Sequence, residues 1–130
     1  MVTRAVIAIV NYDGKVLLGK KRKDSPKVLA GQWHFPGETL EEYESDIGAL
    51  VRGIKAEANL DIRVGKYLGK SISLTSKRDT RWYECFSKTG EISAGSDLEE
   101  VKWVPKNKAL ESCSEKARNL CPQEVLDYFN

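Results

Sequence analysis

The sequence predicts an α/β domain with a mixed sheet. Apolar, β-branched runs separated by turn signals fill the N-terminal part, and one long segment with helical period follows them. Further strand-like runs and two short helical segments complete an order of strands, helix, strands, helix, which is typical of this fold class. With 130 residues, 41% hydrophobic and 31% charged, residues 1–130 are expected to form a single domain with a substantial core.

The first predicted element is a β-hairpin. Residues 3–10 are rich in β-branched side chains, Asp13-Gly14 is a strong turn signal, and residues 15–18 resume the apolar run. After a basic stretch and a loop, residues 33–35 form a short predicted strand that Pro36-Gly37 ends.

The helical period begins at residue 44 or 45 and continues to about residue 58. Ser45 is the expected N-cap and Asn59 suits the C-terminal stop. Gly48 and Gly53 each cost roughly 0.5–1 kcal/mol against alanine, so packing has to offset them. The apolar residues at helical spacing predict one buried stripe: Ile47, Leu50, Val51, Ile54 and Ala58.

The remainder of the chain alternates apolar runs with turn signals before it becomes helical. Strands are predicted at residues 62–68, 71–74, 81–86 and 101–104, with turns at 88–90 and 94–96. Two short helices are expected at about 108–120 and 122–129, with Pro122 in a favoured first-turn position.

Composition excludes several classes of function. A net charge of +2 gives no electrostatic basis for a nucleic-acid surface, so no nucleic-acid partner is expected. No run approaches the ~18 apolar residues of a membrane span, and no targeting segment is expected. Three scattered cysteines suggest free thiols and a cytoplasmic location. With His34 as the only histidine, a nitrogen–sulfur metal site is disfavoured, whereas an oxygen site stays open.

One face of the predicted helix carries the candidate chemistry. Positions 53, 56 and 57 are neighbours on that face, and carboxylates at all of them would suit Mg²⁺ or Mn²⁺ carried by a diphosphate. Glu57 is present, but Gly53 and Ala56 occupy the other places. Further acidic candidates lie before the helix and on its stripe, and near the late strand: Glu38, Glu41, Glu42, Glu44, Asp46, Glu99 and Glu100.

The run from Gly31 to Gly37, G-Q-W-H-F-P-G, and the helix after it resemble the Nudix hydrolase family. The family's box, G-x5-E-x7-R-E-U-x-E-E-x-G-U, can be laid without a gap on residues 38–60. The matching residues are Glu44, Arg52, Ile54, Glu57 and Leu60. The departures are Glu38 and Asn59 in place of glycines and Gly53 and Ala56 in place of glutamates. Residues 13–21 and 99–105 are also similar to the family, in the right order.

The resemblance implies a three-layer α/β/α sandwich that hydrolyses nucleoside diphosphates linked to another group. In the family the box glutamates bind Mg²⁺ and position or deprotonate the attacking water. Glu57 inherits metal binding, and Glu44 inherits metal or water contacts. Arg52 inherits the role of holding a carboxylate through a forked bond.

The resemblance assigns the other site residues as follows. Gly37 is placed in both the metal site and the substrate site, and Lys21 and Arg22 are placed at phosphate. Glu99 or Glu100 lies near one more catalytic carboxylate of the family. Trp33 could stack on a nucleobase.

Each candidate also has a structural interpretation. Glu57 could be a solvated helix residue, and Glu44 a partner of the helix dipole. Arg52 could make a structural ion pair, and the basic stretch 20–23 could be a solvated edge. Core packing is the alternative for Trp33 and for His34.

Two functions follow from these observations. The first is a divergent, Mg²⁺-dependent (or Mn²⁺-dependent) hydrolase that cleaves the diphosphate linkage of a nucleoside triphosphate or nucleoside diphosphate derivative, slowed by Gly53 and Ala56, with Glu44, Glu99 or Glu100 as surrogate base. The second is an inactive module of the same fold that binds nucleotides or other proteins. The nucleotide, the acting base and the oligomeric state stay open at this point.

Overall fold

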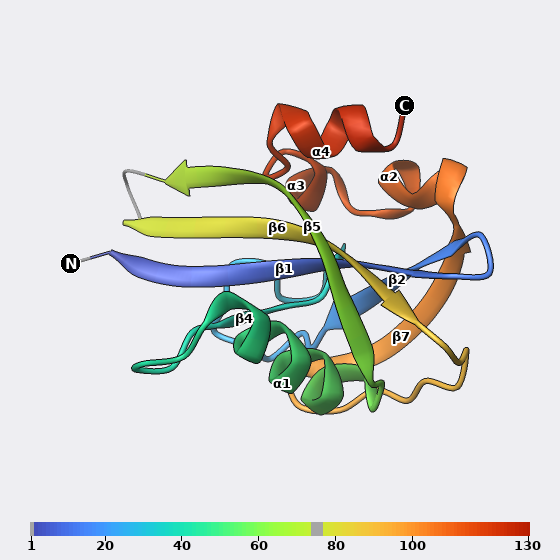
Figure 1. The fold of residues 1–130 in the computed structure, drawn as a ribbon, viewed down its shortest axis with the longest axis horizontal. Helices are drawn as coiled ribbons and strands as arrows, with labels where there is room; N and C mark the ends of the chain where they lie inside the picture. The colour runs from blue at the N-terminus through green and yellow to red at the C-terminus, as the bar shows by residue number, and fades with distance from the viewer. Residues whose placement is uncertain (1, 74–76) are drawn as a thin grey trace.

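The computed structural model describes residues 2–73 and 77–130, and in these parts of the chain seven strands form one mixed sheet (Figure 1). The strands are β1 (Thr3–Tyr12), β2 (Lys15–Lys21), β3 (Trp33–His34), β4 (Gly37–Thr39), β5 (Ile62–Ser73), β6 (Arg78–Ser87) and β7 (Leu98–Pro105). The helices are α1 (Asp46–Ala58), the 3-10 helix η1 (Lys106–Lys108), α2 (Ala109–Ser112), α3 (Glu115–Arg118) and α4 (Gln123–Tyr128).

Strand β1 lies at the centre of the sheet. It runs parallel to β6 and antiparallel to β4, and it also forms the predicted hairpin with β2, where Tyr12 pairs with Lys15. Asp13 and Gly14 both have positive φ, 50° and 73°, as a tight two-residue hairpin turn requires. The hairpin prediction is confirmed, although β1 and β2 are each longer than expected.

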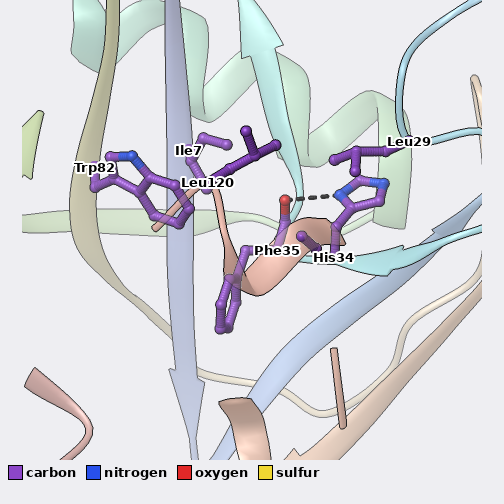
Figure 2. Close-up of a pocket in the computed structure, with 7 residues that line it drawn as sticks. Ile7, Leu29, His34, Phe35, Trp82 and Leu120 are labelled. Atoms are coloured by element: carbon purple, nitrogen blue, oxygen red, sulfur yellow. Dashed lines mark hydrogen bonds between the residues drawn. The ribbon is translucent and has the colours of Figure 1, made fainter. Parts of the chain in front are cut away.

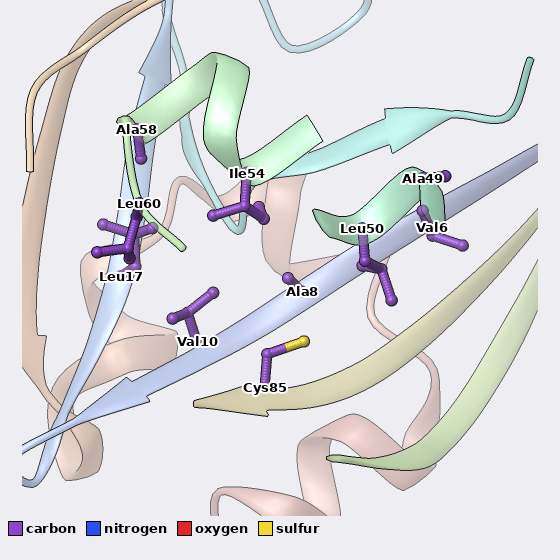
Figure 3. Close-up of a cluster of buried hydrophobic side chains, with 10 residues drawn as sticks. All are labelled: Val6, Ala8, Val10, Leu17, Ala49, Leu50, Ile54, Ala58, Leu60 and Cys85. Atoms are coloured by element: carbon purple, nitrogen blue, oxygen red, sulfur yellow. The ribbon is translucent and has the colours of Figure 1, made fainter. Parts of the chain in front are cut away.

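The two faces of β1 belong to two separate hydrophobic clusters. Val6, Ala8 and Val10 pack with α1 on one face, together with Cys85 of β6 (Figure 3). Ile9 lies in the second cluster, which includes residues of the C-terminal helices such as Val125. This period-2 alternation places α1 on one side of the sheet and α3 and α4 on the other (Figure 1), so the predicted α/β/α sandwich is confirmed.

Both ends of α1 follow the prediction. The Oγ of Ser45 accepts a 3.0 Å bond from the Gly48 amide, and Asn59 adopts a left-handed conformation at φ 55°. The predicted buried stripe is wrong for Ile47 and Val51, which are 58% and 40% exposed.

The buried face of α1 instead consists of Ala49, Leu50, Gly53, Ile54, Glu57 and Ala58. The helix is rotated toward its small residues, because these allow a close approach to the neighbouring strands. Periodicity of apolar residues cannot detect that rotation, since Gly53 and Glu57 carry no hydrophobic signal.

Several predicted elements differ in extent. The runs 62–68 and 71–74 form one strand, β5, whose register against β6 shifts twice; Leu74 lies outside the described residues. In place of the predicted helix 108–120, η1 runs directly into α2, and extended backbone at Cys113 separates α2 from α3, which Ser114 caps. Pro122 is the N-cap of α4, one position earlier than expected. None of the helices in the described parts of the chain has the length and apolar character needed to cross a membrane.

The orientation of α1 can be tested with two matched substitutions. Ile54→Ala removes a side chain that is 1% exposed and should lower the free energy of unfolding by about 2–5 kcal/mol. Ile47→Ala makes the same chemical change on the exposed side and should cost less than about 1 kcal/mol. Urea unfolding of both variants measures the difference, and equal costs would contradict this orientation.

Candidate functional site

The candidate site is built where β4 passes beside α1. Gly37 pairs with Ile7 of β1, and a Cβ atom at Gly37 would lie 2.5 Å from the carbonyl oxygen of Val6. A glycine is therefore required for β4 to reach this position. The metal and substrate roles predicted for Gly37 stay predictions; in the structure it allows the close approach of two strands.

Arg52 joins α1 to the segment that precedes it. Its Nε and Nη2 each donate a 2.8 Å bond to the carboxylate of Glu44, which is the forked geometry expected for this pair. Nη2 also donates to the Thr39 carbonyl at 3.1 Å, and Nη1 lies 3.4 Å from Glu38 and 3.5 Å from Glu41.

These contacts determine the electrostatic state of Glu44. The bonds from Arg52 and, secondarily, from the Glu41 amide lower the pKa of Glu44 to about 2. Glu44 is therefore an ionised carboxylate whose two oxygens are both engaged. This arrangement makes it a poor proton acceptor at neutral pH and a good anchor for the loop between β4 and α1.

Glu57 has a very different environment. Its side chain is buried, with 6% of the residue exposed, and within the described parts of the chain its Oε2 has no hydrogen-bond partner. Burial raises the pKa of Glu57 to about 8; the charge of Lys21 opposes this shift and that of Glu38 adds to it. A carboxyl group held in this way is mostly protonated at neutral pH unless a cation lies beside it.

Asp97 approaches Glu57 because the segment before β7 is attached to the end of α1. The amide of Gly95 donates to the Glu57 carbonyl at 2.9 Å, and the amide of Ser93 donates to the Ala58 carbonyl at 3.1 Å. A Cβ atom at Gly95 would lie 2.4 Å from the Ala56 carbonyl oxygen, so glycine is needed here as well.

Asp97 also makes an ion pair with Lys21. The Nζ atom of Lys21 lies 3.3 Å from Oδ2 of Asp97, which also accepts a 3.2 Å bond from Ser25 and lies 3.8 Å from Nζ of Lys27. Burial acts to raise the pKa of Asp97, but these cationic and polar partners outweigh it and lower the pKa. Lys21 is only 9% exposed, so the site contains a buried ammonium group of its own.

Sequence reasoning missed Asp97 and favoured Glu99 and Glu100. Those two carboxylates each lie 3.8 Å from Lys20 on the outer part of β7, with side chains 37% and 60% exposed. Asp97 is instead among the charges that act on Glu57. The available signal was its place directly after the 94–96 turn, where the chain enters a strand.

His34 brings a second unpartnered atom close to the same charges. Its Nδ1 is 2.9 Å from the Phe35 carbonyl, which can only accept, so Nδ1 carries the hydrogen and Nε2 keeps a lone pair. Within the described residues Nε2 has no partner, and burial lowers the pKa of His34 to about 4. The ring is neutral at physiological pH.

A small apolar cavity adjoins His34 (Figure 2). Its volume is about 20 Å³, enough for a water molecule but far too small for a nucleobase. Its walls are Ile7, Leu29, His34, Phe35, Trp82, Ala117 and Leu120. A base could enter only if the side chains of this wall moved, for example Leu120, which is 47% exposed.

The two remaining substrate candidates, Arg22 and Trp33, each already have a partner. Arg22 pairs with Asp24 at 3.4 Å and its side chain is 56% exposed. The ring of Trp33 lies under Nζ of Lys102, which is 4.1 Å from the ring centroid, so one of its faces is already occupied. Their substrate roles stay predictions.

The positions that lack box glutamates have different surroundings. Ala56 is exposed, whereas Gly53 is buried against β4. A Cβ atom at Gly53 would lie 2.6 Å from Cβ of Glu38. Glu38 therefore takes up the space that a side chain at position 53 would need.

The donor set suits a cation carried by phosphates better than a prebuilt metal cage. Within residues 2–73 and 77–130, no group of three or more His, Cys, Asp or Glu side chains is arranged to hold a metal ion. Oε2 of Glu57 is nevertheless a buried acceptor with no partner. Mg²⁺ is commonly held by one or two carboxylates plus substrate phosphates, and Glu57 fits that mode of binding.

The sequence is similar to a known domain family and to named proteins. The model of the NUDIX domain matches residues 1–125. A protein of Mycobacterium tuberculosis (strain H37Rv) named "Putative 8-oxo-dGTP diphosphatase 2" is 30% identical over 118 residues, which cover 81% of this chain and 83% of that protein. "CTP pyrophosphohydrolase" of Escherichia coli (strain K12) is 40% identical over 63 residues, 48% of this chain; the match spans less than half of that protein, 45%.

Solved structures show the same architecture. A NUDIX hydrolase from Nitrosomonas europaea superposes with a TM-score of 0.79 at 17% identity, over 98% of this chain and 69% of that one. The solution structure of the Escherichia coli ORF135 protein has a TM-score of 0.70 at 28% identity, over 92% of this chain and 85% of that one. The first likeness concerns the fold alone.

The buried carboxyl of Glu57 predicts a pH dependence of stability. Its pKa is about 8 in the folded protein against 4.5 for the free group, so the folded state binds more protons between these values. Without divalent cations, the free energy of unfolding should therefore be greatest below pH 4.5. It should fall by about 1.4 kcal/mol per pH unit as the pH rises toward about 8.

Glu57→Gln should abolish this fall, because glutamine does not titrate, and should make the protein more stable than wild type at about pH 8. Urea unfolding at about pH 5, 6.5 and 8 measures the effect. Glu111→Gln, at an exposed residue, is the control and should leave the wild-type dependence unchanged. Parallel curves for wild type and Glu57→Gln would contradict the assignment.

Proposed function

The chain belongs to the NUDIX domain family, and we propose that it hydrolyses the diphosphate linkage of a nucleoside triphosphate or of a nucleoside diphosphate derivative. The observation that carries the proposal is the buried, unpartnered carboxyl oxygen of Glu57, on which the charge of Lys21 acts. The names of the relatives, a CTP pyrophosphohydrolase and an 8-oxo-dGTP diphosphatase, support the same reaction class.

The cationic side chains of the proposed site would bind the phosphates. Lys21 is preorganised by its bond to Asp97, and Lys27 approaches the same carboxylate. These ammonium groups would offset the negative charge of a diphosphate, in a partly buried place where the interaction is stronger than in water.

We assign Glu57 to hold a divalent cation that the diphosphate carries, with Mg²⁺ or Mn²⁺ as the candidates. Such a cation, when bound, would neutralise phosphate charge and make phosphorus more open to attack by water. The same carboxyl would then lose its proton, because a neighbouring positive charge lowers the pKa of an acid.

Glu44 and Arg52 act in this proposal as positioning residues. Their forked bond fixes the loop between β4 and α1, and with it the position of Glu38 next to the helix. The low pKa of Glu44 argues against a role as general base.

We propose that turnover is slow. A positioned general base contributes about 10²–10⁴-fold to a rate, and α1 carries no carboxylate at Gly53 or Ala56.

A second candidate is a nucleotide-binding module without turnover. Lys21 and Lys27 bring two ammonium groups together at Asp97, which favours a site that binds phosphate through the cations of the chain itself. In that case a nucleotide would stabilise the protein by mass action but would not be cleaved.

Release of phosphate and pyrophosphate from CTP, 8-oxo-dGTP and a nucleoside diphosphate sugar, with and without Mg²⁺, tests the proposal. Glu57→Gln should lower the Mg²⁺-dependent rate by at least about 100-fold. Because this variant is expected to fold stably, lost activity cannot be attributed to unfolding.

Glu111→Gln, an exposed residue paired with Lys108, should retain the wild-type rate. Thermal stabilisation by nucleotides without product release would instead support the binding module. Equal Mg²⁺-dependent rates for wild type and Glu57→Gln would overturn the role of Glu57.

A further inference from the structure

The side chain of Glu38 fills the space next to Gly53, between β4 and α1. A Cβ atom built on Gly53 would lie 2.6 Å from Cβ of Glu38, 3.0 Å from its Cγ and 3.5 Å from its Oε2. The first distance is far below a normal contact, and Cβ of Glu38 cannot move without its backbone. The side chain of Glu38 in this position therefore excludes any side chain at position 53.

The carboxylate of Glu38 lies over the same face of α1 as Glu57. Its Oε2 is 3.4 Å from Nη1 of Arg52, and its Oε1 accepts a 3.0 Å bond from the Thr39 amide. Its charge is one of those that raise the pKa of Glu57, so the two carboxyl groups interact. Glu38 keeps 21% of its side chain exposed, which leaves it open to a ligand.

Glu57 gives the independent indication that a ligand belongs here. Only 6% of this residue is exposed, and within the described parts of the chain its Oε2 has no partner. A buried acceptor without a partner is costly, and a bound cation would remove that cost.

We propose that Glu38 supplies from β4 the second carboxylate for a phosphate-borne divalent cation at Glu57, in place of a side chain that α1 lacks at Gly53. This inference rests on the proposed function in one respect, the binding of a diphosphate that brings the cation, and does not depend on turnover. Two carboxylates plus phosphate oxygens form a common Mg²⁺ environment.

A purely structural role for Glu38 does not explain the arrangement. Glu44 binds Nε and Nη2 of Arg52, and Glu41 lies 3.5 Å from Nη1, so Glu38 is not the sole carboxylate near that nitrogen. Glycine is also unfavourable inside a helix, and its lack of a side chain at position 53 leaves room for Glu38.

Binding of Mn²⁺ in the presence of imidodiphosphate, a slowly hydrolysed diphosphate, tests this inference without any need for turnover. Glu38→Gln keeps the shape of the side chain and should weaken Mn²⁺ binding by at least about tenfold, measured by electron paramagnetic resonance. Glu41→Gln is the matched control, because it removes a similar contact to Nη1 of Arg52, and it should bind Mn²⁺ as wild type does.

The exchange of the two residues provides a second arm. Gly53→Glu alone should lower the melting temperature, because the new side chain meets Glu38. The double variant Glu38→Gly, Gly53→Glu should recover the melting temperature and bind Mn²⁺ within about threefold of wild type. A single variant Gly53→Glu as stable as wild type would overturn the steric part.

Failure of this inference can be distinguished from failure of the proposed function by measuring product release on the same samples. Weak Mn²⁺ binding by Glu38→Gln without turnover in wild type would overturn the hydrolase and leave this inference standing. Turnover in wild type with unchanged Mn²⁺ binding by Glu38→Gln would overturn the inference alone. Absence of Mn²⁺ binding by wild type would also overturn it.

Discussion

Burial of one carboxyl group without a hydrogen-bond partner is the constraint on which the site depends. Moving Glu57 out of water without a hydrogen-bond partner is unfavourable, and the packing of α1 on the sheet through Leu50 and Ile54 has to offset that cost. The charge of Lys21 only partly compensates, since the pKa of Glu57 stays well above its usual value. The unpaired oxygen follows from this one placement, and the proposed cation would provide its missing partner.

The pairing of β2 with β7 brings the charges together. Lys21 at the end of β2 pairs with Leu98 at the start of β7, so Asp97 comes beside the ammonium group. The attachment of Gly95 to the last turn of α1 then brings this pair within electrostatic range of Glu57. Residues far apart in sequence meet because strand register and a loop attachment coincide, whereas the bond between Arg52 and Glu44 only fixes the local loop.

Much of the fold could be predicted from the sequence because its signals are local. The cap at Ser45, the stop at Asn59 and the turn at Asp13-Gly14 depend on neighbouring residues, and the structure confirms them. The burial of α1 could not be predicted in the same way, because it depends on which strands the helix meets. Ile47 was expected to be buried on its hydrophobicity, but tertiary packing left it exposed.

The site was less predictable than the fold for the same reason. Glu57 was found from its place in a local pattern, but its burial depends on contacts with distant segments. Asp97 reaches the site through strand register, which no short pattern contains. The proximity of Glu38 to Gly53 is likewise a contact between a strand and a helix, and each residue considered singly is only a departure from the family's box.

The contact between Glu38 and Gly53 has a consequence for how such chains are classified and how they diverge. The family's box has glycine at position 38 and glutamate at position 53, whereas this chain has Glu38 and Gly53. A pattern that scores each position separately counts two lost residues, although both arrangements contain one acid and one glycine. A chain changed at only one of these two positions would have glycine at both, with an acid missing, or glutamate at both, with the two side chains crowded. Neither intermediate keeps both the charge and the space, so the two positions are expected to change together.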